Sequence, residues 1–343
     1  MRYTVLDLAR EAGVSVATVD RVLNNRAGVR ERTRTIVIET ARRVGYLPER
    51  SNGPIDETPS PLSTVRLDFA LPAGANMFMV TLREQLEAQA RNRPQLDVRV
   101  AAIEGFNTDT LAATLLDYRG KTQGVGVVAL DHPTVREAIR ELAASGVHVV
   151  TIVSDILYVP RVAYVGIDNR AAGRLAGYLV RRFLSPGRPA KVALFAGSLA
   201  YRGHEEREMG FRHMLAEEAP NLRIVELRET RDDPERAYLE ARSLFEAHPD
   251  LAAIYNVGAG NSGIAQALKE SGREREVVFI AHEISQENRM LLLDATLDAV
   301  IDQNPRVEAR EALHILERVS RGLPFEYHAP RLHVVFKENI PDT

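Results

Sequence analysis

Polar side chains recur in this sequence directly after short apolar runs, and one aromatic residue, Phe78, stands among them. Carboxylates and amides pair with hydroxyl groups, arginine donates to ring oxygens, and an aromatic ring stacks on the apolar face of a sugar. The candidates are Asn76, Phe78, Asp131, Ser154, Asp155, Arg202, His204, Arg207, Asn256, Glu283 and Gln303. Their types predict a binding site for a sugar or polyol, provided that the fold brings them together.

A glycine-rich loop supports a second interpretation. The segment GAGNSG, residues 258–263, fits the G-x-G-x-x-G fingerprint of dinucleotide-binding loops, follows an apolar run and opens a helical pattern. Glu283 follows it by about 20 residues, as that fingerprint requires. An NAD-binding oxidoreductase is therefore the alternative function. We favour binding without catalysis, because the loop stands late in the series of strands and no hydride-transfer constellation accompanies it.

The composition excludes several other kinds of catalytic and metal site. The 343 residues include no cysteine, which excludes disulfides, thiolate nucleophiles and thiolate metal sites. The nine histidines contain no i, i+4 pair, and Ser198 near His204 lacks the G-x-S-x-G elbow of a hydrolase. No apolar run approaches the ~20 residues of a membrane span, and the N-terminus lacks the apolar core of a signal peptide. We expect a cytoplasmic protein with no metal, cofactor, membrane association or enzymatic activity.

The elements that must position the candidate residues lie in residues 65–343. Eleven strand-like runs alternate there with helical patterns: VRLDFAL, DVRVAAI, GVGVVAL, HVVTIVS, VAYVGI, KVALFAG, LRIVEL, AAIYNV, VVFIAH, DAVIDQ and LHVVF. Such spacing is typical of parallel βαβ units, whose ligands lie beyond the carboxyl ends of the strands. Because eleven strands are too many for one sheet, we expect an α/β fold of two lobes with doubly wound parallel sheets. Lobe one should hold residues 65–166 and 303–323, and lobe two residues 167–302 and 324–343.

The first fifty residues differ from the rest in charge. They hold ten arginines, no lysine and six acids, a net charge of +4, whereas the whole chain carries −3. A basic segment on an acidic body favours an anionic partner such as DNA, although solvated helices also use arginine.

Two short helical patterns with a glycine between them lie in this basic segment. Thr4 and Asp7 resemble a capping box, Gly13 can end the first helix, and Ser15 can cap a second helix over residues 16–23. A third pattern follows over residues 31–44, in which Ile36, Val37, Ala41 and Val44 are expected to point inward. This arrangement predicts a helix-turn-helix unit over residues 1–48.

The segment TVLDLAREAGVSVATVDRVLNN, with GVRERTRTIVIETARRVGYLP after it, resembles the headpiece of the lactose-repressor (LacI) family of bacterial transcription regulators. The resemblance implies that Val16, Ala17 and Arg21 read bases in the major groove. It also places Thr4, Ser15, Thr18, Asn24, Val29 and Thr33 at or near phosphates. Asp20 stands where the family usually has serine, so an acid lies beside the DNA backbone.

Residues 49–64 read as a linker, because they hold three prolines, one glycine and several small polar residues. The Ala-Arg-x-Leu-like core of the family's hinge helix is not found there. The body, residues 65–343, resembles the periplasmic sugar-binding-protein fold that the family carries as its sensor domain. The resemblance implies a homodimeric regulator, most simply a repressor of carbohydrate-related genes, that binds double-stranded operator DNA under control of a sugar or polyol effector.

Overall fold

The structure is a computed structural model, and it describes residues 5–23, 33, 35–37, 40–41, 63–104 and 106–341. The chain divides into two compact units, Met1–Thr58 and Pro59–Thr343.

The N-terminal unit contains the two helices that the sequence predicts, α1 (Val5–Glu11) and α2 (Val16–Leu23). Between them Gly13 has a φ of +66°, a conformation that favours glycine. The Ser15 hydroxyl accepts a hydrogen bond from the Thr18 amide at 3.2 Å, which confirms Ser15 as the cap of α2. The predicted helix-turn-helix is therefore present.

A small apolar core joins these helices to helical residues of the third pattern. Its buried members are Leu8, Ala9, Val19, Val22, Val37 and Ala41. Ile36 was expected to point inward but is 42% exposed. Val37 and Ala41, one helical turn apart, occupy the inner face instead, and Ile36 lies about 100° around the helix from Val37. Val44 lies outside the described residues.

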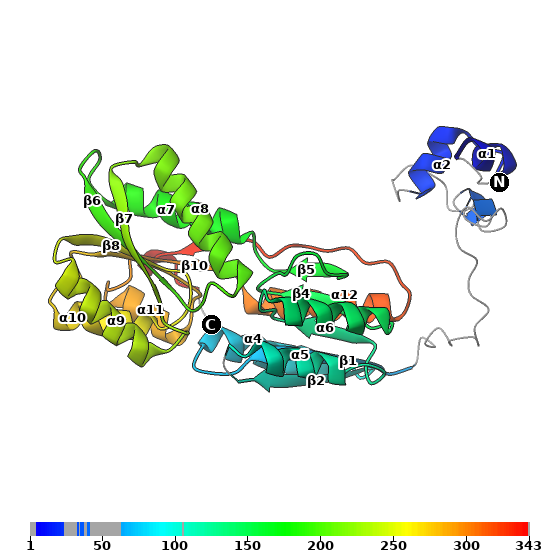
Figure 1. The fold of residues 1–343 in the computed structure, drawn as a ribbon, viewed down its shortest axis with the longest axis horizontal. Coiled ribbons are helices and arrows are strands. Elements are labelled where there is room, and N and C mark those ends of the chain that lie inside the picture. The colour runs from blue at the N-terminus through cyan, green and yellow to red at the C-terminus, as the bar shows by residue number, and fades with distance from the viewer. Residues whose placement is uncertain are drawn as a thin grey trace. The chain divides into compact units, whose positions relative to one another are not determined.

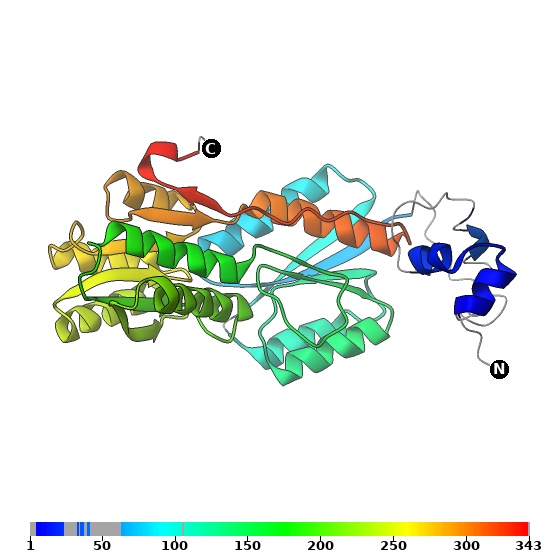
Figure 2. The same cartoon turned by 90° about the horizontal axis from the view of Figure 1, so that it is seen from above.

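The first lobe of the C-terminal unit is built on a five-stranded parallel sheet (Figure 1). Its strand order is β2-β1-β3-β4-β5. The strands are β1 (Val65–Pro72), β2 (Leu96–Ile103), β3 (Gly124–Val127), β4 (His148–Ile152) and β5 (Ala163–Val165). Helices α4 (Met77–Arg91) and α12 (Pro305–Ser320) cover one face, while α5 (Thr108–Asp117) and α6 (Pro133–Ala144) cover the other (Figure 2).

The second lobe has a six-stranded sheet in the order β11-β10-β9-β8-β6-β7. Its strands are β6 (Ala190–Ala196), β7 (Leu222–Glu229), β8 (Leu251–Asn256), β9 (Val278–His282), β10 (Ala299–Asp302) and β11 (His333–Val335). Its helices are α7 (Asn169–Phe183), α8 (Arg202–Glu218), α9 (Pro234–Ala247), α10 (Asn261–Glu270) and α11 (Gln286–Leu293), followed by the 3₁₀ turn η1 (Lys337–Asn339). Helices α7 and α8 pack together, as do α9 and α10.

The predicted α/β fold with two doubly wound lobes is confirmed, and all eleven apolar runs contain a strand. One detail of the expected parallel sheets is wrong, because β11 pairs with β10 in antiparallel orientation. The chain passes between the lobes three times: after β5, after β10 and between α12 and β11 (Figure 1). Several strand ends of both lobes therefore meet where the lobes face each other.

Candidate functional site

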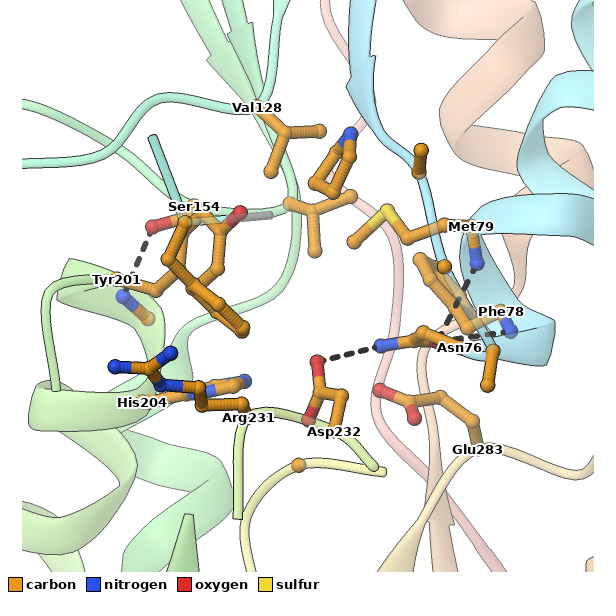
Figure 3. A pocket seen from close by; sticks show the side chains of 18 of the residues that line it. Asn76, Phe78, Met79, Val128, Ser154, Tyr201, His204, Arg231, Asp232 and Glu283 are labelled. Carbon is orange, nitrogen blue, oxygen red and sulfur yellow. Dashed lines mark hydrogen bonds between the residues drawn. The ribbon is translucent and has the colours of Figure 1, made fainter. Parts of the chain in front are cut away.

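A cavity lies between the two lobes (Figure 3). Seven of the eleven candidate residues line it: Asn76, Phe78, Ser154, His204, Arg207, Glu283 and Gln303. They come from segments far apart in the sequence, and the strand ends bring them together.

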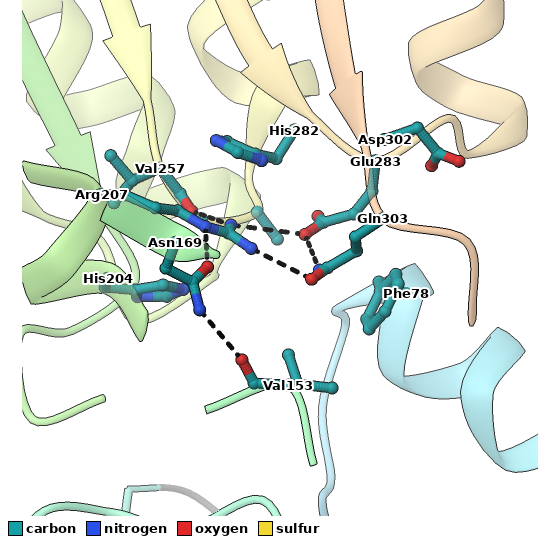
Figure 4. A network of polar contacts seen from close by, with 12 residues as sticks. Phe78, Val153, Asn169, His204, Arg207, Val257, His282, Glu283, Asp302 and Gln303 are labelled. Carbon is teal, nitrogen blue, oxygen red and sulfur yellow. Dashed lines mark hydrogen bonds and ion pairs between the residues drawn. The ribbon is translucent and has the colours of Figure 1, made fainter. Parts of the chain in front are cut away.

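Arg207, on α8, is the centre of a buried polar network (Figure 4). Only 2% of this residue is exposed, and its Nε donates to Asn169 Oδ1 at 2.8 Å. Its two terminal nitrogens donate to the Val257 carbonyl at 2.8 Å and to Gln303 Oε1 at 3.2 Å. Glu283 completes the network, with Oε1 3.6 Å from Arg207 and 2.8 Å from Gln303 Nε2. The network fixes the direction of each side chain before a ligand arrives.

Glu283 is a carboxyl group with unusual acid–base character. Burial raises its pKa to about 7, and the Asp232 and Asp302 carboxylates act in the same direction, although Arg207 opposes them. The group can therefore both accept and donate hydrogen bonds near neutral pH, which suits a hydroxylated ligand.

Several residues that line this cavity have strained backbone conformations. Val153, Arg231, Asp232 and Glu283 all line it, and all have positive φ values between 56° and 64°. Such conformations cost free energy in non-glycine residues and persist where the surrounding structure holds them. Here they turn the chain sharply at the ends of β4, β7 and β9 and direct side chains toward the space between the lobes.

The two walls of the cavity differ in polarity. The first lobe contributes mainly apolar side chains, among them Phe78, Met79, Phe106 and Val128. The second lobe contributes the charged ones, Arg207, Arg231, Asp232 and Glu283. Figure 3 shows Phe78, Met79 and Val128 across from Asp232 and Glu283. A ligand with one apolar face and several hydroxyl groups matches this arrangement.

Several contacts join the lobes around the cavity. Asn76 Nδ2 donates to Asp232 Oδ2 at 3.0 Å, and the Gly203 amide donates to Ser154 Oγ at 3.1 Å. The rings of Phe106 and Tyr201 meet edge to face, with centroids 5.4 Å apart. The lobes are therefore in contact across the cavity.

Four predicted ligand residues do not line the cavity, because protein partners hold them elsewhere. Asp155 is bonded to Thr151 at 2.7 Å and to Arg161 at 2.6 Å. Asp131 pairs with Arg136, and Arg202 pairs with Glu206 at 2.9 Å.

Asn256, the fourth of them, is fully buried and holds the loop that follows β8. Its Nδ2 donates to Asn261 Oδ1 at 2.7 Å and to the Ala259 carbonyl at 3.0 Å. The residue therefore orders the glycine-rich loop and does not face the cavity.

Sequence reasoning missed several cavity residues, including Phe106, Tyr201 and Asp232. Phe106 follows β2 and Asp232 follows β7. Because ligands lie beyond the carboxyl ends of strands, the segments after these two strands could have revealed both residues. Tyr201 is the N-cap of α8 and packs against the core of the first lobe, a role with no local sequence signal.

In the described residues, neither the dinucleotide-binding loop nor the Ser198–His204 pair has the geometry that its catalytic function requires. In the GAGNSG loop, a side-chain Cβ at Gly258 would meet Asp232, and one at Gly263 would lie 1.9 Å from the Pro234 carbonyl oxygen. These glycines pack closely against protein atoms, so their lack of side chains is explained by the packing of this lobe. His204 Nδ1 lies 3.0 Å from the Ser198 carbonyl oxygen, whereas the Ser198 hydroxyl accepts from the Ala200 amide. The pair is therefore not a nucleophile with its base.

The predicted DNA-contacting residues are only partly described. Val16 is 42% exposed at the start of α2, Ser15 is also exposed, and Thr18 and Thr33 are half-buried. Thr4, Asn24 and Val29 lie outside the described residues, as do the side chains of Ala17, Asp20 and Arg21. In the described part of the chain, no helix combines the length and apolar character needed to cross a membrane.

Comparison with known proteins identifies both units. Residues 67–324 match the periplasmic binding protein domain, and residues 4–49 match the bacterial regulatory proteins of the lacI family. The catabolite control protein A of Priestia megaterium is 28% identical over 218 residues, which are 63% of this chain and 62% of that protein.

A second relative is the D-ribose/D-allose-binding protein of Pseudomonas aeruginosa, 24% identical over 253 residues, which are 69% of this chain and 76% of that protein. The crystal structure of GanP, a glucose-galactose binding protein from Geobacillus stearothermophilus, superposes with a TM-score of 0.75 at 24% identity. That match covers 81% of this chain and 99% of GanP, and it shows the fold of the two lobes. The chain thus belongs to the periplasmic binding protein domain family over most of its length, and residues 4–49 form a DNA-binding domain of the lacI family of bacterial regulatory proteins.

Proposed function

We propose that this protein is a transcriptional repressor whose affinity for operator DNA is controlled by a neutral or charged sugar or polyol bound between its lobes. The observation that carries the proposal is the buried Arg207–Gln303–Glu283 network facing Phe78 in the interlobe cavity, in a chain with a helix-turn-helix unit. Prearranged donors and acceptors beside an aromatic ring are what a hydroxylated ring requires.

The names of similar proteins support this class of ligand. One relative is described as binding D-ribose and D-allose, and one protein with the same fold is described as binding glucose and galactose. Both the regulators and the binding proteins act by binding, so we propose that this chain does so too, without catalysis and without a cofactor.

The DNA-binding surface is proposed from the helix-turn-helix unit. Val16, Ala17 and Arg21 are the residues expected to read base edges in the major groove. Thr4, Ser15, Thr18, Asn24, Val29 and Thr33 are expected beside phosphates, with Asp20 as a modulating acid. The 42% exposure of Val16 on the described part of α2 fits this role.

Ligand and DNA are coupled by a change in the lobes. A ligand shifts DNA affinity only if it binds more tightly to one of the two conformations, the one competent for DNA or the other. We propose that the regulator is a homodimer, because two headpieces then recognise two half-sites of a near-palindromic operator.

The function is tested in two steps with the full-length protein. Duplexes are first selected from a random-sequence library, and their affinity is measured by fluorescence anisotropy. Monosaccharides, polyols and sugar phosphates are then screened by thermal shift, and each compound that stabilises the protein is added to the anisotropy assay. Selection of one palindromic duplex, and a change in its affinity with a stabilising sugar, are expected. Failure to enrich any duplex contradicts a role in transcription.

A further inference from the structure

Asp232 occupies a space that two glycines leave open. It follows β7 and lies beside Gly197 and Gly258, which come from the loops after β6 and β8. A Cβ atom at Gly197 would lie 2.1 Å from Asp232 Oδ1, and one at Gly258 would lie 2.6 Å from it. Contacts this short cannot exist, so a side chain at either position would displace the carboxylate.

Backbone geometry and two hydrogen bonds hold the carboxylate in this space. Asp232 has a φ of 56°, and Arg231 before it has the same value. The Ala259 amide donates to Asp232 Oδ1 at 2.8 Å, and Asn76 Nδ2 donates to Oδ2 at 3.0 Å from the opposite lobe. Asn76 is itself fixed, because its Oδ1 caps α4 by accepting from the Phe78 and Met79 amides. The carboxylate therefore has a defined place in the cavity wall (Figure 3).

Most of the basic groups near Asp232 are already engaged by protein groups or held neutral by burial. All three nitrogens of the Arg207 guanidinium are bonded to protein groups, and Glu283 lies beside it. Burial lowers the pKa of His204, which disfavours its charged form, although the Asp232 carboxylate opposes this shift. Arg231 lines the cavity, but it is exposed, so solvent screens its charge more than that of the half-buried Asp232. Arg202 does not line the cavity and is paired with Glu206 at 2.9 Å.

We propose that Asp232 is the specificity-determining residue of the cavity, which selects a neutral hydroxylated ligand and excludes anionic ones such as sugar phosphates and sugar acids. The proposal rests on the proposed function of the cavity as a sugar site. A ligand hydroxyl donates to the carboxylate in place of Asn76, whereas a phosphate or carboxylate at the same point meets a like charge in a partly buried site. Like-charge contact of this kind is a strong means of rejecting a competitor.

The test compares matched neutral and anionic ligands by isothermal titration calorimetry. The pairs are D-galactose with D-galacturonate, D-ribose with D-ribose 5-phosphate, and D-glucose with D-glucose 6-phosphate. The wild type should bind the neutral member of at least one pair and not its anionic partner. Asp232→Asn keeps the shape but loses the charge, so it should weaken the neutral ligand by about 10- to 100-fold and reduce the discrimination within the pair. The control Asp250→Asn removes an exposed acid that pairs with Lys191 outside the cavity, and should change neither.

Gly197→Ala tests whether the position of the Asp232 carboxylate matters for binding, and not only its presence. The added methyl group should displace Asp232 and weaken neutral ligands in the wild type, yet have little effect in an Asp232→Ala background, because the three atoms nearest to it all belong to Asp232. Thermal unfolding of each variant shows whether it is folded. Tighter binding of an anionic member by the wild type, or equal discrimination by Asp232→Asn, overturns the proposal while leaving the sugar site intact. No binding of any pair, together with no sugar effect on DNA affinity, refutes the proposed function itself.

Discussion

At the scale of single residues, the cavity contains buried polar side chains that form hydrogen bonds with one another. Arg207, Gln303 and Asn169 are all at most 2% exposed, and each has a partner in the same network. Buried polar groups are stable only while their hydrogen bonds are made, so the removal of one member affects the others.

Arg207→Ala should lower the free energy of unfolding by about 3–5 kcal/mol, because Glu283 is left buried without its cation. It should also abolish the ligand response of DNA binding while leaving operator affinity unchanged, since Arg207 belongs to the C-terminal unit. Denaturant unfolding and anisotropy measure the two effects. Gln303→Ala keeps the charges and should give the same loss of response with less destabilisation. Collapse of operator affinity together with the response would show that the two activities are not separable.

Glu283 should make stability depend on pH in the direction opposite to an ordinary acid. Its pKa is about 7 in the folded protein and near 4.5 when unfolded, so the folded state holds the proton more tightly. The stabilising contribution is complete below pH 4.5 and is lost as the pH rises through 7. Relative to Glu283→Gln, the wild type should therefore lose at most about 3 kcal/mol of stability between these pH values. If the free energy of unfolding changed equally with pH in both proteins across this range, the raised pKa of Glu283 would be contradicted.

At the scale of elements, close contact between two helices positions the network. A Cβ atom at Gly173 on α7 would lie 1.9 Å from the Arg207 carbonyl oxygen, and one at Gly210 on α8 would lie 2.1 Å from the Arg170 carbonyl oxygen. The backbones of α7 and α8 approach one another at these glycines, which is why Arg207 reaches Asn169 at the start of α7.

Gly173→Ala should force α7 and α8 apart and destabilise the protein by about 1–3 kcal/mol, the usual cost of overpacking. The displacement carries Arg207 with it, so affinity for the sugar should fall more than stability alone explains. Calorimetric titration at a temperature where the variant remains folded measures this. The control Arg182→Ala changes an exposed residue of the same helix and should alter neither quantity.

At the scale of the whole molecule, DNA recognition and ligand recognition belong to separate compact units. The basic N-terminal segment carries the first, and the two lobes carry the second. The two units are coupled if the ligand binds more tightly to one of the two conformations, the one competent for DNA or the other. This difference is measured as a change in DNA affinity when ligand is added.

Arg21→Ala should weaken binding to the selected operator by about 1–3 kcal/mol and relax the preference at one base pair per half-site. Anisotropy with duplexes changed one base pair at a time identifies that position. Against the duplex altered there, the variant should bind about as well as the wild type. An equal loss on every duplex, with a shallower dependence on salt, would instead assign Arg21 to a phosphate contact.

Local sequence by itself determined the secondary structure, the order of the strands along the chain and the helix-turn-helix unit. Apolar periodicity, Gly13 and the Ser15 cap act over a few residues, so they are readable without the fold. Glu283 and Gln303 stand directly after β9 and β10, and Arg207 lies on the helix that follows β6, so the sequence also predicted that they would meet, because parallel strands end at one edge.

Only the tertiary structure decided which polar residues face the cavity. Asp131 and Asp155 turn to Arg136 and Arg161, since nearby cations satisfy their charges within their own lobe. Asp232 reaches the cavity because Gly197 and Gly258 leave it room and Asn76 bonds to it from the other lobe. These partners lie up to 156 residues away, and contacts at such separations have no local signature in the chain.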